Sequence, residues 1–139
     1  MKRSWMIPAL IVAVNATVVL LRWSSLPAMV PAHFDLQGNA AGSMPRGTLL
    51  FFLLAGAVFC LFSYVAARLI NNRAKTQKKA DMQLLGVTIL ASGLTLVLFA
   101  SSLVTLTTGT VPFFMLAEPF ILGLALAGFI YCLIKARNI

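Results

Sequence analysis

Glu118 is the only acidic residue within a long apolar stretch of this sequence, and it is the first residue to suggest chemistry. A carboxylate in hydrocarbon costs about 2.5 to 3.5 kcal/mol on insertion scales, so it needs a partner or a proton. Counted along the apolar runs, Glu118 and Asn15 both lie about 10 Å below the same membrane face. With Ser102 near that face, they predict a polar site inside the bilayer.

The charged partners on that side are few. Arg22 and Arg46 flank the loop between the first two apolar runs, and His33 lies within the loop. We therefore predict that one of these cations lies above Glu118, with Asn15 beside the carboxyl group. The alternative reading, that Glu118 bonds Asn15 or a serine and only locks helices together, stays open because such interhelical bonds are common.

His33 and Asp35 are two residues apart, a spacing that points both side chains the same way in an extended segment. With Glu118 as a third ligand they are candidates for a divalent cation site. In the alternative, Asp35 forms a turn and His33 packs with a polar tip. The sequence has no nucleophile and base pair and no phosphate-binding glycine loop, so it favours a non-enzymatic protein without a cofactor.

The composition predicts that these residues are surrounded by lipid. Of the 139 residues 60% are hydrophobic and 10% are charged, against about a quarter charged in soluble domains. The net charge of +8 does not indicate nucleic acid, because the basic residues cluster beside the apolar runs, where they meet lipid head groups. Cys60 and Cys132 lie inside these runs and indicate packing rather than a disulfide or zinc site.

The elements that position the polar residues are predicted to be four transmembrane helices, at about 5–22, 48–68, 84–106 and 111–135. The fold class is an all-α membrane protein, a single four-helix bundle over 1–139, with one long extracytoplasmic loop at 23–47. Basic residues gather at both termini and at 68–79, which places both termini in the cytoplasm. The short 107–110 connection makes the last two helices antiparallel neighbours.

Small and hydroxyl residues predict how these helices pack. The third helix carries Thr88, Ser92, Thr95 and Ser102, and the fourth carries Gly123, Ala127 and Gly128. Small residues let membrane helices approach closely, so both sets are predicted to face neighbouring helices.

The 23–47 loop is predicted to be ordered, as a cap over the polar site, although its prolines and glycines also fit a disordered linker. Pro27 and Pro31 hold the residues before them in an extended conformation. Gly38 and Gly42 permit turns at positive φ.

The 26–42 segment, LPAMVPAHFDLQGNAAG, resembles the outer loop of a bacterial family of small membrane proteins of largely unknown function, best known as the N-terminal part of SdpI-type immunity proteins. The similarity lies in the LPxxVPxHFDxxG pattern after the first helix. It implies residence in the bacterial inner membrane and protection against a secreted toxin.

Three functions follow as hypotheses. The leading one is a binding or immunity protein that engages a peptide, a lipid or a partner membrane protein through the loop and a polar pocket formed by Asn15, Arg22, His33, Asp35, Arg46, Ser102 and Glu118. The second is a membrane-embedded, metal-dependent enzyme. The third is a small transporter or accessory subunit that uses Glu118, for which homo-oligomerisation would be needed.

Overall fold

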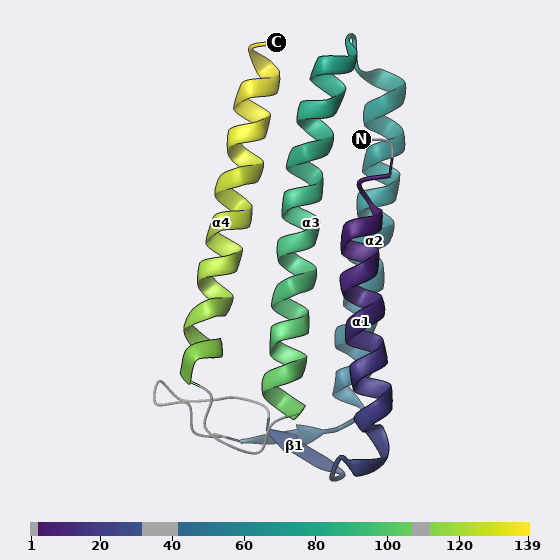
Figure 1. The fold of residues 1–139 in the computed structure, drawn as a ribbon, viewed down its shortest axis with the longest axis vertical. Coiled ribbons are helices and arrows are strands. Elements are labelled where there is room, and N and C mark those ends of the chain that lie inside the picture. The colour runs from purple at the N-terminus through teal and green to yellow at the C-terminus, as the bar shows by residue number, and fades with distance from the viewer. Residues whose placement is uncertain (1–2, 32–41, 107–111) are drawn as a thin grey trace.

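The computed structural model describes residues 3–31, 42–106 and 112–139, without the side chains of 104–117. Within these residues, four helices are long and apolar enough to cross a membrane, which confirms the predicted fold class (Figure 1). The described elements follow one another as α1 (Met6–Arg22), η1 (Trp23–Ser25), β1 (Met29–Pro31), β2 (Ser43–Pro45), α2 (Thr48–Arg73), α3 (Gln77–Leu106) and α4 (Pro112–Arg137).

Helices α2 and α3 extend past their apolar runs into polar sequence. The predicted boundaries were 68 and 84, whereas α2 continues to Arg73 and α3 begins at Gln77. Lys, Arg and Gln are good helix formers, and here they are largely exposed, so these turns are stable outside the apolar layer. Only residues 74–76 remain as a connection, and the Thr76 hydroxyl accepts a hydrogen bond from the Lys79 N–H at 3.2 Å.

Helix α3 is the centre of the bundle. Helices α1 and α2 lie on one side of it and α4 on the other (Figure 1), and α3 packs against all three. Its apolar window is 39% buried, against 17% in each of the other three helices. The outer faces of α1, α2 and α4 therefore expose large apolar side chains, as expected for surfaces that meet lipid tails.

The contact between α3 and α4 depends on glycine. A Cβ atom placed on Gly93 would overlap Ala125 Cβ, and one placed on Gly86 would lie 2.9 Å from Cys132 Cβ. On the α4 side, Gly128 leaves room for Ile89. The absence of side chains at these positions lets the two backbones approach closely.

The predicted packing residues are right for α3 and partly wrong for α4. Thr88, Thr95 and Ser102 are buried, and their hydroxyls bond carbonyls one turn earlier at 2.8 to 3.0 Å. Gly123 and Ala127 are exposed instead, and the space beside Gly123 is open. Small residues occur on both faces of α4, and the face that packs carries Ala125, Cys132 and Ala136.

Two short antiparallel strands, β1 and β2, close the end of the bundle at which α1 ends and α2 begins (Figure 1). We call this the hairpin end, and the opposite end, with the termini and residues 74–76, the basic end. Val30 pairs with Met44 in the ladder, and Gly42 has φ 90°. The predicted extended segment and the predicted turn at Gly42 are both confirmed. Gly38 lies outside the described residues.

Candidate functional site at the hairpin end

Arg46 connects the strand pair to the end of α1. Its Nη1 donates hydrogen bonds to the carbonyl oxygens of Trp23 at 3.3 Å and Leu26 at 3.2 Å. The guanidinium carbon lies 5.0 Å from the centre of the Trp23 ring, within cation–π range. The Arg46 N–H also donates to the Ala28 carbonyl at 2.9 Å and continues the ladder. We call this set of contacts the Arg46 clamp.

An apolar cluster lies directly beneath the clamp. Val19 of α1 and Leu49 of α2 are fully buried, and Trp23 and Leu26 pack against them. The Trp23 ring therefore packs against the apolar cluster and also contacts the Arg46 guanidinium. Because Val30 of β1 is 1% exposed and β1 also contacts α3, the base of the strand pair is held against α3 as well as by the clamp.

Glu118 is hydrogen-bonded to α3. The Ser101 hydroxyl donates to Glu118 Oε1 at 2.9 Å, and both residues lie about two turns or less from the hairpin end of their helices. Pro119 follows directly and is unable to donate to the carbonyl one turn earlier, which weakens α4 at this point. The carboxyl group thus joins the two helices close to the strand pair.

Asn15 lies on a different side of α3. It is 2% exposed in α1, and its Oδ1 has no hydrogen-bond partner among the described residues. Helix α1, which carries Asn15, and helix α4, which carries Glu118, pack against different sides of α3. The single polar site expected from equal depths stays a prediction, with Asn15 on the α1 side of α3 and Glu118 on its α4 side.

The other predicted site residues are placed as follows. Arg22 is exposed in the last turn of α1, and Arg46 is engaged by the Trp23 and Leu26 carbonyls. Ser102 is buried and bonds its own helix at Leu98. His33 and Asp35 lie outside the described residues, so the metal site proposed for them and Glu118 has no described geometry. Elsewhere in the described ranges, no three His, Cys, Asp or Glu side chains come together.

Sequence reasoning missed the role of Trp23. Its carbonyl and ring both contact an arginine 23 positions away, and no local pattern predicts such a contact. The available signal was the presence of one aromatic and one cationic residue at opposite ends of a loop whose ends must meet.

Comparison with known proteins gives one match. Residues 9–58 match the family described as a domain of unknown function (DUF1648). This range contains most of α1, the strand pair and the Arg46 clamp, and ends within α2. No curated protein and no solved structure matches the chain. The match therefore covers the hairpin end and leaves α3 and α4 outside it.

Proposed function

We propose that this chain is a non-enzymatic binding protein of the bacterial inner membrane, of the immunity type, and that the strand pair presents its recognition segment. The observation that carries the proposal is the Arg46 clamp. A linker between two membrane helices needs no buried valine and no arginine bound to two carbonyls. Such a fixed base is typical of a loop that must present its outer residues in one position.

The orientation proposed for this function has the strand pair outside and both termini in the cytoplasm. The basic end carries, among the described residues, Arg3, Arg68, Arg73, Lys75, Lys78, Lys79, Lys135 and Arg137. The hairpin end carries Arg22 and Arg46. This asymmetry supports the orientation through the positive-inside rule.

Single-cysteine labelling tests the orientation. After Cys60→Ala and Cys132→Ala, Ser25→Cys should react with an impermeant thiol reagent in intact spheroplasts, and Thr76→Cys should react only after lysis. Both positions are exposed, so access to the thiol depends on the side of the membrane alone. The reverse pattern would contradict the proposed orientation.

The proposed partner is a membrane-active peptide or a partner membrane protein, which the resemblance of the 26–42 segment to SdpI-type immunity proteins favours. A photoreactive amino acid at Met29, which is 51% exposed on β1, should give a discrete cross-linked product in the native bacterium. The matched position is Leu124, which is 59% exposed on the lipid-facing side of α4. Identical products at both positions, or none at Met29, would refute a recognition role for the strand pair.

A further inference from the structure

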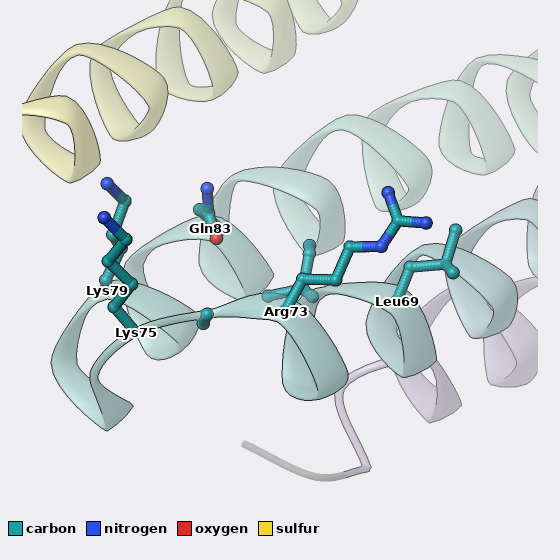
Figure 2. A pocket seen from close by; sticks show the side chains of 7 residues that line it. Leu69, Arg73, Lys75, Lys79 and Gln83 are labelled. Carbon is teal, nitrogen blue, oxygen red and sulfur yellow. The ribbon is translucent and has the colours of Figure 1, made fainter.

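A second concave site lies at the basic end, where α2 meets α3. It is a cavity of about 320 Å³ with Leu69 and Ile70 on its apolar wall and three cationic side chains, Arg73, Lys75 and Lys79. This volume lies at the lower end of the range of roughly 300 to 1,000 Å³ found for small-molecule sites. Figure 2 shows Lys75, Lys79 and Gln83 extending toward the same side, whereas Arg73 extends from the end of α2 toward Leu69.

The charged side chains that line the cavity are all cationic among the described residues. No acidic side chain lines it among the described residues. Asp81, the nearest acidic residue in sequence, is not part of the lining and accepts a hydrogen bond from Gln77 at 2.9 Å. Because α2 ends where α3 begins, their helix dipoles oppose each other at this point, so the three side-chain charges dominate the potential.

The position of the cavity along the helices matches the lipid head-group layer. Helix α2 has 26 residues, and about 20 residues cross a hydrocarbon core of roughly 30 Å. Counted from Thr48, the hydrocarbon core therefore ends near Arg68, directly before the first lining residue. The apolar wall then faces the acyl-chain boundary, and the cations face the phosphate level.

From these observations we infer that the cavity binds the phosphate of an anionic phospholipid head group, with Lys75 and Lys79 beside the phosphate, Arg73 adding its positive charge from the other end of the cavity, and Leu69 and Ile70 against the glycerol and first acyl carbons. Gln83 supplies an amide that bonds either the phosphate oxygens or a head-group hydroxyl. A free phosphate ion is also an anion, but it has no apolar part that would contact the apolar wall. This site is separate from the hairpin end and does not depend on the function proposed for it.

Native mass spectrometry of the full chain tests the site. The delipidated protein in detergent is mixed with dioleoyl phosphatidylglycerol or with dioleoyl phosphatidylcholine, which carries the same tails on a zwitterionic head group. We expect phosphatidylglycerol to bind at least about tenfold more tightly, because each basic residue near the head group adds to the attraction. Equal binding of the two lipids would overturn the inference.

Two triple variants with the same change in net charge locate the binding. Arg73→Gln, Lys75→Gln and Lys79→Gln together remove the cavity's cations. Lys78→Gln, Lys135→Gln and Arg137→Gln together remove three cations of the same end that do not line it. The first variant should lose at least about tenfold in phosphatidylglycerol affinity and the second less than about twofold. Equal losses in both would show diffuse attraction and overturn the site.

Two controls complete the experiment. The thermal midpoint of each triple variant, measured without added lipid, should match that of the parent, so that a lost complex does not reflect unfolding. Potassium phosphate should displace no more phosphatidylglycerol than potassium chloride of equal ionic strength. Specific displacement by phosphate would instead assign the cavity to the free ion.

Discussion

Helices α3 and α4 are similarly apolar, yet they occupy different environments. The α3 window is 39% buried and the α4 window 17%, because α3 contacts three helices and α4 packs mainly on α3. In water, hydropathy separates interior from surface. In lipid both faces of a helix are apolar, so small residues and internally bonded polar groups mark the interior instead. Residues of one type should therefore respond oppositely according to the face they occupy.

The largest difference is expected between two glycines. Gly93→Ala places a methyl group into Ala125 and should lower the free energy of unfolding by about 2 kcal/mol, within the usual range for overpacking. Gly123→Ala adds the same methyl group where the space is open, and should be neutral or slightly stabilising. Unfolding in a mixed-micelle denaturant titration measures both. Adding Ala125→Gly should rescue Gly93→Ala, and a failure of rescue would show that the two positions do not contact.

Two arginines at the hairpin end provide the next comparison. Arg46→Gln removes charge-assisted bonds to two carbonyls and the stacking on Trp23, and should destabilise the strand pair by about 1 to 2 kcal/mol. Arg22→Gln removes the same charge from an exposed position and should have little effect. Hydrogen exchange at Val30 and Met44 measures the difference. Equal protection in both variants would mean that the clamp does not hold the strands.

Asn15 allows the polar interior to be examined directly. Its Oδ1 is buried without a partner in the described part of the molecule, so Asn15→Leu should raise the free energy of unfolding by about 1 kcal/mol. Thr17→Leu serves as the control, because on the exposed face of the same helix it adds apolar surface without removing an unpaired buried polar atom. A loss of stability in Asn15→Leu would indicate that the amide has a bonding role in the membrane.

The smallest effect is expected at two neighbouring serines. Ser101→Ala removes the donor to Glu118 between helices and should cost about 0.6 kcal/mol, the average for interhelical hydrogen bonds in membranes. Ser102→Ala removes a bond within one helix and should cost less. The same denaturant titration measures the loss of stability in each single variant. The double variant Ser101→Ala/Ser102→Ala serves as the common reference. A larger cost at Ser102 would contradict the assignment of Ser101 as the bonding partner of Glu118.

Much of the fold was predictable because span length and apolar composition are local properties. Four apolar runs predicted the four helices of the described residues, and the prolines and glycines predicted the extended segment and the turn at Gly42, but not the pairing of β1 with β2. The polar turns of α2 and α3 were not predictable from hydropathy, since an exposed Arg73 or Lys79 looks the same in a loop and in a helix. The basic cavity was missed for this reason.

The arrangement of the site was less predictable because it depends on helix rotation and on contacts between distant residues. Depth counting placed Glu118 near the hairpin end, but depth alone does not say on which side of α3 a residue lies. Asn15 and Glu118 were predicted at the same depth, but their helices pack against different sides of α3. Similarly, small residues on both faces of α4 left its packing face undetermined until Ala125 was seen against Gly93.

The unequal lengths of the helices have a consequence for the surrounding bilayer. Helix α1 has 17 residues and α3 has 30, which correspond to about 26 Å and 45 Å of helix. The hydrocarbon core is roughly 30 Å thick, so lipid beside α1 must thin or α1 must draw its flanking residues inward, whereas α3 extends beyond the core at its ends. This hydrophobic mismatch lies on one side of the molecule only. Drawing the flank inward is the smaller adjustment, because η1 continues α1 to Ser25 and gives a span of 20 residues, about the number that crosses the core.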